Sequence, residues 1–176
     1  MLDQGRYTWR HNAVLRIILD NFSDLSDPAW KVYCDLLGAT KIAGTTIPPD
    51  IIPTKQRPDL VFVNDSSKTI VIFELTVPFE QNIEAAHIKK SNKYSGLTSD
   101  LQEQGYDAKL ICFEVGSRGM ISHTNKCRLQ SIFPTLFSKP MKRAASKLLK
   151  SISKRAISCS YSIFYSKYDH ERSINS

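Results

Sequence analysis

The chain has 176 residues, of which 41% are hydrophobic and 23% are charged, and its 24 basic and 17 acidic side chains give a net charge of +7. This length is typical of one domain with its own hydrophobic core, and the composition excludes intrinsic disorder and collagen-like repeats. The four cysteines are too widely spaced for a zinc site or a secreted disulfide framework, so we expect reduced, small hydrophobic residues.

Neither a membrane span nor a signal peptide is expected. No segment approaches the roughly 20 apolar residues of a spanning helix. Arg6, Arg10 and Arg16 interrupt the apolar middle that a signal peptide would need. We therefore expect an intracellular protein, nuclear or cytosolic, that does not bind membranes.

The basic residues are concentrated in the C-terminal third. Residues 1–115 carry 12 basic and 15 acidic side chains, whereas residues 116–176 carry 12 basic and 2 acidic ones. A solvated helix face would explain such a run, and so would a surface that attracts phosphate groups. The cations that we expect to contact nucleic acid are Lys139, Lys142, Arg143, Lys147, Lys150, Lys154 and Arg155, together with Arg10.

The N-terminal third predicts two helices and a loop. Apolar residues at intervals of three and four predict a helix over 8–21. Pro28 opens a second, short helical pattern that ends at Gly38. Four prolines between residues 48 and 58 exclude a continuous helix there and predict a loop with one edge strand around 44–52.

A β-hairpin is predicted next, because 60–63 and 69–77 are rich in Val, Ile and Phe and flank a polar turn. A long helix follows over 83–101, then a buried strand over 108–115 and a helix over 125–133. Pro140 opens a last helix that extends to about residue 168. Its apolar stripe is Leu148, Leu149, Ile152, Ile157, Tyr161 and Phe164.

These elements predict an α/β fold, with a small mixed sheet flanked by helices. No repeat or linker divides the chain, so residues 1–176 are expected to form one domain. Its core would span about 8–135, and the basic C-terminal helix about 140–168.

The hairpin brings two carboxylates together. With its turn centred on residues 66 and 67, Asp59 lies opposite Glu74. Side chains opposite each other across strands are roughly 5 Å apart, where like charges repel unless a cation lies between them. Oxygen ligands of this kind suit Mg²⁺. The alternative is structural, with Asp59 in a turn and Glu74 at a solvent-exposed strand end.

The inward face of the following helix carries Lys90, together with His87 and Tyr94. An inward lysine needs a counter-charge or a phosphate, and the first turns of this helix return to the level of Glu74. Lys90 would then point at the carboxylate pair. The alternative is that its ammonium group extends to water. His87 and Tyr94 are expected to be hydrogen-bonded core residues.

Three motifs in order resemble a known family. Arg57-Pro58-Asp59 is followed after fourteen residues by Glu74-Leu75-Thr76, and then by Lys90-x-x-x-Tyr94. This arrangement resembles the restriction-like endonuclease domain of non-LTR retrotransposons, a branch of the PD-(D/E)XK nuclease superfamily. The segment from Arg6 to Asn12 is similar to segments upstream of that domain, so the resemblance covers about Arg6 to Tyr168.

The resemblance implies a restriction-endonuclease-like αβββαβ core and metal-dependent cleavage of DNA. Mg²⁺ or Mn²⁺ would be bound by Asp59, Glu74 and the backbone carbonyl of Leu75, with Lys90 as the catalytic lysine. The usual E-x-K lysine is replaced here by Thr76. Lys89 and Lys93 are therefore rivals of Lys90, and an inactive nucleic-acid-binding module of the same fold is the main alternative to a nuclease.

Accessory roles are expected for His11, Lys93 and Tyr94. His11 lies on the inward face of the first helix, where it would either orient a ligand or water or serve as a core residue. Arg10 either binds phosphate or is simply exposed. The resemblance also implies partners, namely DNA and a reverse transcriptase or other domains of a larger polyprotein. A purely structural or partner-binding domain is the third alternative.

Overall fold

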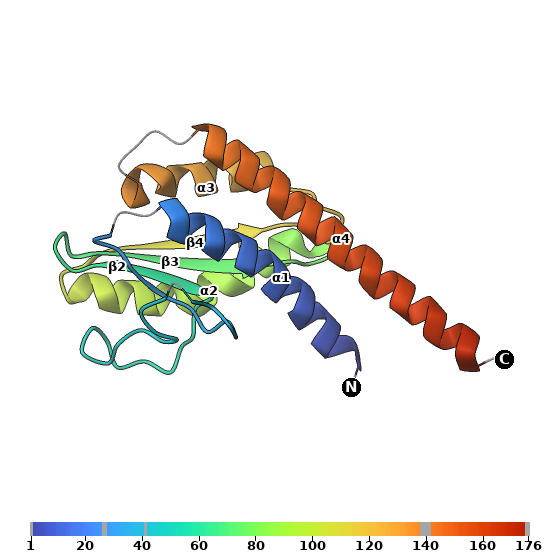
Figure 1. Cartoon of the computed structure of the whole chain (residues 1–176). Helices are drawn as coiled ribbons and strands as arrows, with labels where there is room; N and C mark the ends of the chain where they lie inside the picture. Colours follow the sequence, from blue (N-terminus) through green and yellow to red (C-terminus); the bar gives the residue numbers. More distant parts are fainter. Residues whose placement is uncertain (1, 26–27, 41, 138–141, 175–176) are drawn as a thin grey trace.

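The computed structural model describes residues 2–25, 28–40, 42–137 and 142–174. Figure 1 shows the described elements in chain order. These are the helix α1 (Leu2–Leu25), the strands β1 (Lys31–Tyr33), β2 (Leu60–Asn64) and β3 (Thr69–Thr76), the 3₁₀ helix η1 (Glu80–Asn82), the helix α2 (Ile83–Glu103), the strand β4 (Asp107–Glu114), and the helices α3 (His123–Leu136) and α4 (Lys142–Ile174).

The four strands form one mixed sheet in the order β1-β2-β3-β4. β1 and β3 run antiparallel to β2, whereas β4 runs parallel to β3 after the α2 crossover. The predicted α/β class and mixed sheet are therefore confirmed. The hairpin also has the predicted register, since Leu60 pairs with Phe73 and Val63 with Ile70.

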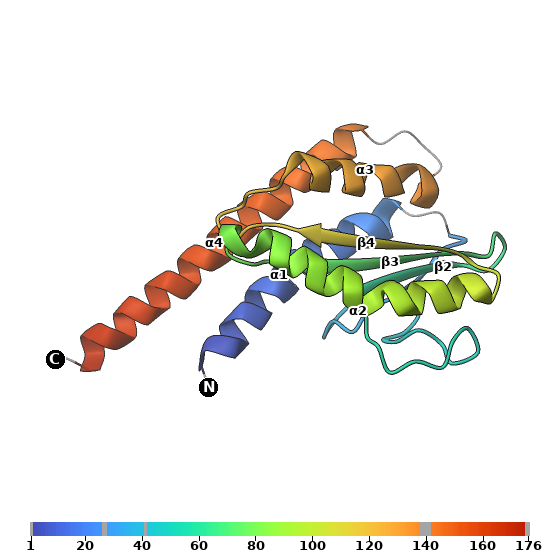
Figure 2. The ribbon, with the colours of Figure 1, turned by 180° about the vertical axis from the view of Figure 1, so that it is seen from behind.

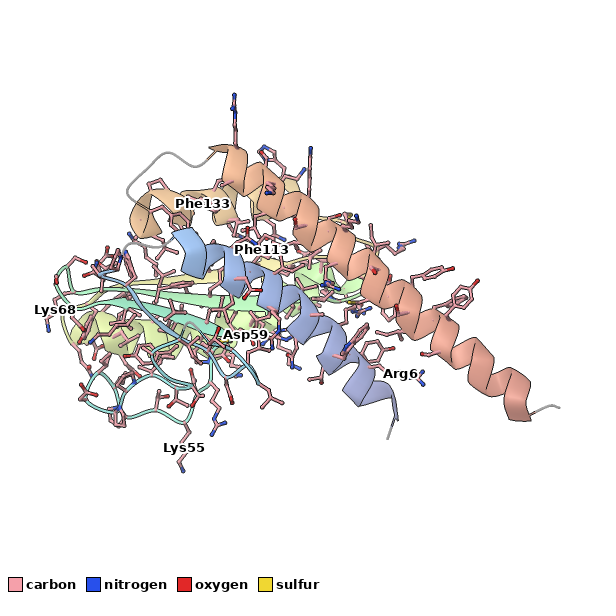
Figure 3. The ribbon with its side chains drawn as sticks, viewed as in Figure 1. Arg6, Lys55, Asp59, Lys68, Phe113 and Phe133 are labelled. Carbon is pink, nitrogen blue, oxygen red and sulfur yellow. The ribbon has the colours of Figure 1, made fainter. Side chains whose placement is uncertain are left out.

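Helices cover both faces of the sheet (Figures 1 and 2). α1, α3 and α4 lie on one face, where Phe22 packs edge-on against Phe62 and Phe73 at 5.5 and 6.0 Å between ring centroids. Phe113 and Phe133 lie in the same layer (Figure 3). α2 covers the other face. The start of β2 and the C-terminal end of β3 thus lie between α1 and α2.

The prediction of a short helix after Pro28 is wrong, because Lys31–Tyr33 form the edge strand β1. Pairing with β2 satisfies backbone groups along its edge and buries Val32 and Tyr33. Leu37, which the helical pattern counted as inward, is 95% exposed. The apolar spacing of this short segment fits both structures, and contacts with the distant β2 decide between them.

No edge strand is described around 44–52. Gly44 makes one isolated bridge to Tyr33, and the segment continues as bends and turns. Ile47, Ile51 and Ile52 are nevertheless buried, because they cover the α2 side of the sheet next to β2. The loop therefore contributes to the core without extending the sheet.

The long basic C-terminal helix is present as α4, but its inward face is only partly as predicted. Leu148, Leu149 and Ile152 are buried, whereas the predicted Ile157, Tyr161 and Phe164 are 48, 61 and 57% exposed. The buried face runs instead through Ala145, Ala156 and Cys159. Small residues allow α4 to approach α1 closely, and the C-terminal end of α4 extends beyond the sheet (Figures 1 and 2).

No helix within the described part of the chain combines the length and the apolar character needed to cross a membrane. All four cysteines are free, and three of them, Cys34, Cys112 and Cys159, are buried as expected of small hydrophobic residues.

Candidate active site

The hairpin brings Asp59 and Glu74 together, as its register predicts. Glu74 lies in β3 and is 1% exposed, whereas Asp59 precedes β2 and its side chain is 18% exposed. The backbone N–H of Asp59 donates to Glu74 Oε1 at 3.1 Å, and that of Leu75 donates to Asp59 Oδ2 at 2.8 Å. Figure 3 shows Asp59 beside α1. A solvent-exposed Glu74 is therefore excluded, because both carboxylates belong to one buried cluster.

Lys90 contacts this cluster from α2. Its Nζ donates to Glu74 Oε2 at 2.6 Å, and three quarters of its side chain is buried. Burial lowers the pKa of Lys90, but the charges of Glu74 and then Asp59 raise it more, so that the net shift is upward. Lys90 is therefore a protonated partner of the carboxylates, and the alternative of an ammonium group extended to water is wrong.

His11 reaches the same cluster from α1. Its Nε2 lies 3.2 Å from both Asp59 Oδ2 and the carbonyl oxygen of Leu75, and its Nδ1 lies 3.1 Å from Asn12 Oδ1. Burial lowers the pKa of His11, but the hydrogen bond to Asp59 and the charge of Asp59 outweigh burial and raise it. His11 is thus a partner of the site and not an isolated core residue.

The two carboxylates have pKa values shifted in opposite directions. Burial raises the pKa of Asp59, but His11, Lys90 and the Leu75 N–H together lower it below its usual value. Burial and the neighbouring charge of Asp59 raise the pKa of Glu74 despite the contact with Lys90. His11 and Lys90 therefore do not fully offset the burial and mutual repulsion of the two carboxylates. A further cation would favour the charged form of Glu74.

Tyr94 and Lys93 lie next to the carboxylate cluster on the α2 side, and the Tyr94 side chain is also a hydrogen-bonding neighbour of Glu74. Tyr94 is fully buried, and its hydroxyl donates to the Arg57 carbonyl oxygen at 2.9 Å. Lys93 Nζ donates to that hydroxyl at 2.7 Å. Burial and the charge of Glu74 raise the pKa of Tyr94, which keeps the phenol protonated. Tyr94 therefore holds the segment that carries Asp59, and Lys90 rather than Lys93 contacts Glu74.

A surface pocket of about 370 Å³ opens beside these residues. His11, Leu75 and Lys90 line it, together with Tyr7 and Thr76. Asp59 and Glu74 are not among its lining residues. They lie behind His11 and Lys90, which line the pocket and contact the two carboxylates. A ligand in this pocket would first meet two basic side chains, the Lys90 ammonium group and the His11 imidazole, which suits a phosphate group.

The oxygen donors of the cluster fit a hard divalent cation. Asp59 Oδ2 and the Leu75 carbonyl oxygen both lie 3.2 Å from His11 Nε2, and Glu74 Oε2 accepts a hydrogen bond from Lys90 Nζ. Mg²⁺ is typically held by one or two carboxylates with water completing its shell, and Mn²⁺ accepts similar ligands. Among the described residues, no group of three His, Cys, Asp or Glu side chains is placed to hold a metal ion. The oxygen ligands that this cluster offers are two carboxylates and one backbone carbonyl.

The predicted nucleic-acid contacts have different positions. Arg10 is 4% exposed, and it donates to the Val77 carbonyl oxygen at 2.7 Å and to Ser160 Oγ at 2.9 Å. It therefore joins α1 to α4 and to the residue that follows β3, and it is not an exposed surface cation. Lys139 and the side chain of Lys142 lie outside the described residues. The remaining predicted cations are exposed on α4, namely Arg143, Lys147, Lys150, Lys154 and Arg155.

A further buried carboxylate, outside this cluster, was missed by the sequence analysis. Glu114, at the end of β4, is 1% exposed and accepts from His87 Nδ1 at 2.9 Å, with Arg128 Nη1 at 3.5 Å. Asn125 donates to its backbone carbonyl at 2.8 Å and accepts from Arg128 at 3.0 Å. The signal was present, because Glu114 lies in an apolar strand as Glu74 does.

No protein-family model matches this chain, and a search of curated proteins finds no matching relative.

Proposed function

We propose that this protein is a metal-dependent DNA endonuclease that hydrolyses phosphodiester bonds and nicks its substrate. The observation that carries the proposal is the cluster of Asp59, Glu74 and Lys90, in which two buried carboxylates from one hairpin share a site with a lysine from the next helix. The order of elements, α1-β1-β2-β3-α2-β4, supports assigning the chain to the restriction-endonuclease-like (PD-(D/E)XK) fold.

In this proposal Asp59, Glu74 and the Leu75 carbonyl bind the metal. A bound Mg²⁺ or Mn²⁺ would lower the pKa of a coordinated water and neutralise charge on the phosphate. Lys90, which is cationic and lines the pocket, stabilises the charge that develops on the phosphate oxygens in the transition state. His11 and Tyr94 act as positioning residues, because they hold Asp59 and the chain segment just before it.

The product would be a nick with a 3′-hydroxyl group. In a retroelement this hydroxyl would prime reverse transcription, with a reverse transcriptase supplied by another domain of a larger polyprotein. The exposed cations of α4 would bind the DNA backbone, with an affinity that decreases steeply as salt increases.

The test is nicking of supercoiled plasmid by the purified protein in Mg²⁺ or Mn²⁺, with an EDTA control. Asp59→Ala and Glu74→Ala should both abolish nicking. Asp65→Ala is the matched control, because Asp65 lies in the turn of the same hairpin and its side chain is 53% exposed and pairs with the exposed Lys31. Equal activity in all three variants would exclude the proposed site.

The second candidate is a catalytically inactive nucleic-acid-binding module of the same fold. It is favoured by Thr76, which occupies the position of the usual E-x-K lysine. This candidate predicts a gel shift of DNA without cleavage in either metal. A rise in melting temperature on adding Mg²⁺ that Glu74→Ala removes would still establish the metal site, because a ligand that binds only the folded state stabilises it.

A further inference from the structure

One face of α4 changes character along its length. Its exposed positions recur at intervals of four and three residues, and the first four are all basic, namely Arg143, Lys147, Lys150 and Lys154. The positions that continue the same stripe are Ile157, Tyr161 and Phe164, with Tyr165 beside them. This is a second, outward stripe, separate from the one that packs on α1 and the sheet.

The two halves of this stripe meet at a groove of about 780 Å³ between α4, α3 and the loop after β4. Lys150, Lys154, Ile157 and Tyr161 line it from α4, and Lys126 lines it from α3. Arg143 and Lys147 line a neighbouring hollow that shares Lys150 with the groove. Every charged side chain described along both surfaces is basic, so the complementary ligand is an anion.

The groove is built by the fold and does not depend on flexible side chains alone. Ser153 Oγ donates to the Gly119 carbonyl oxygen at 2.8 Å, which fixes the loop against α4. Gly119 has φ of +82°, and a Cβ there would lie 2.7 Å from both Ile157 and Ser153. The loop can therefore approach α4 this closely only with glycine at this position.

The aromatic end of the groove distinguishes between kinds of nucleic acid. Tyr161 and Tyr165 are 61 and 52% exposed, and their ring centroids are 4.7 Å apart. Bases in a duplex are stacked on one another, and a protein ring on the outside of the duplex cannot stack on them. Cations that follow a backbone beside exposed aromatic rings are the arrangement of single-strand binding sites.

The geometry points to a binding site for an unpaired nucleic-acid strand in this groove, with Lys126, Lys150 and Lys154 on its phosphates and Tyr161 stacked on a base. This inference rests on the proposed function for the choice of nucleic acid as the anion. A second copy of the chain is a poorer occupant, because it would bring two sets of the same cations into one interface.

The groove is also connected to the candidate active site. Arg10 donates to the Val77 carbonyl oxygen and to Ser160 Oγ, Val77 lines the active-site pocket, and Ser160 precedes Tyr161. The groove could thus hold the strand left unpaired when a duplex opens next to the cleavage site.

The test is fluorescence anisotropy with a labelled oligothymidine and with a duplex of the same length, in EDTA so that cleavage plays no part. Tyr161→Ala should weaken oligothymidine binding by about 5- to 150-fold, the value of one stacked base, and leave duplex binding unchanged. Lys154→Glu should weaken oligothymidine binding, whereas Arg155→Glu, its neighbour on the helix that does not line the groove, should weaken it much less.

Equal losses for Lys154→Glu and Arg155→Glu, or no effect of Tyr161→Ala, would overturn the inference. So would a dimer in sedimentation that Tyr161→Ala dissociates while the wild type fails to bind oligothymidine. All three side chains are exposed, and matching melting temperatures would show that the variants fold.

Plasmid nicking in Mg²⁺ is scored separately. Nicking without groove-dependent binding removes only this inference, and groove-dependent binding without nicking removes only the endonuclease.

Discussion

Two buried glutamates on neighbouring parallel strands have similar surroundings but different second partners. Glu74 of β3 and Glu114 of β4 are each 1% exposed, and each is contacted by a basic side chain of α2, Lys90 and His87 respectively. The second neighbour of Glu114 is a cation, Arg128. For Glu74 it is Asp59, whose backbone N–H donates to Glu74 Oε1 and whose negatively charged carboxylate raises the pKa of Glu74.

Other side chains of the fold offset the burial of Glu114, whereas the burial of Glu74 is offset only in part. Each carboxylate oxygen of Glu114 has a nitrogen partner, His87 Nδ1 at 2.9 Å and the Arg128 guanidinium at 3.5 Å, and such partners stabilise a buried carboxylate within a structure. Glu74 shares its cationic surroundings with Asp59, and the repulsion contributes to its raised pKa. A buried excess of negative charge beside a pocket is typical of a ligand site.

The largest effect that would test this comparison is expected for Glu74→Gln. Plasmid nicking should decrease by about 1,000-fold, because an electrostatic contact specific to the transition state contributes on that order. The melting temperature should change little, since the substitution also removes repulsion with Asp59. Activity and thermal unfolding are measured on the same preparation. Full activity in Glu74→Gln would mean that Glu74 is as structural as Glu114.

The next effect in size is expected for Lys90→Met, with nicking reduced by about 100-fold. Lys89→Met is the matched control, because Lys89 is the neighbouring residue on α2 and is exposed. Initial rates in Mg²⁺ are compared with DNA affinity from gel shifts. Equal losses for the two variants would remove Lys90 from its proposed role.

Glu114→Gln should show the opposite pattern. Its free energy of unfolding should decrease by about 2 kcal/mol, the value of hydrogen bonds to a buried charged group, while nicking changes only a few-fold. Urea unfolding measures the loss. A double-mutant cycle with Arg128→Met would isolate the contribution of that ion pair. A large loss of activity at unchanged stability would show that Glu114 also belongs to the active site.

The smallest effect is a pH dependence at a third carboxylate, Glu80. Burial raises its pKa, but the backbone N–H of Arg118, at 2.7 Å, and the Arg118 guanidinium, at 3.0 Å, lower it below the usual 4.5. A lowered pKa stabilises the folded state above the unfolded value, and this contribution is lost as pH falls through the folded one. The wild type should therefore unfold at a higher temperature than Glu80→Gln near neutral pH, and the gap should close as pH falls below 4.5. A gap that is independent of pH would contradict this.

The hairpin is the part of the candidate site that the sequence alone predicts in most detail. Its two apolar runs and the polar turn between them are local, so the register follows from the turn position, and with it the opposition of Asp59 and Glu74. The helical period of α2 likewise predicted that Lys90 faces the sheet. The candidate site could be predicted because its parts are close in the chain or bear a regular pattern.

The site residues that were missed or left open are held by distant partners. Glu114 is balanced by Arg128, whose helix comes later in the chain, and no spacing rule relates the two. Arg10 is buried because Val77 and Ser160 accept its hydrogen bonds, 67 and 150 residues further along the chain. The sequence contains these groups, but their pairing depends on how the helices pack on the sheet.

Residue patterns by themselves determined the α/β class, the hairpin and the long amphipathic helices, because backbone periodicity and turn chemistry act over a few residues. Only the tertiary structure decided that Lys31–Tyr33 form a strand and that the buried face of α4 continues through Ala156 and Cys159 instead of Ile157 and Tyr161. In each case the local preference was weak or ambiguous. The burial of apolar area and the satisfaction of backbone hydrogen bonds by remote segments outweighed it.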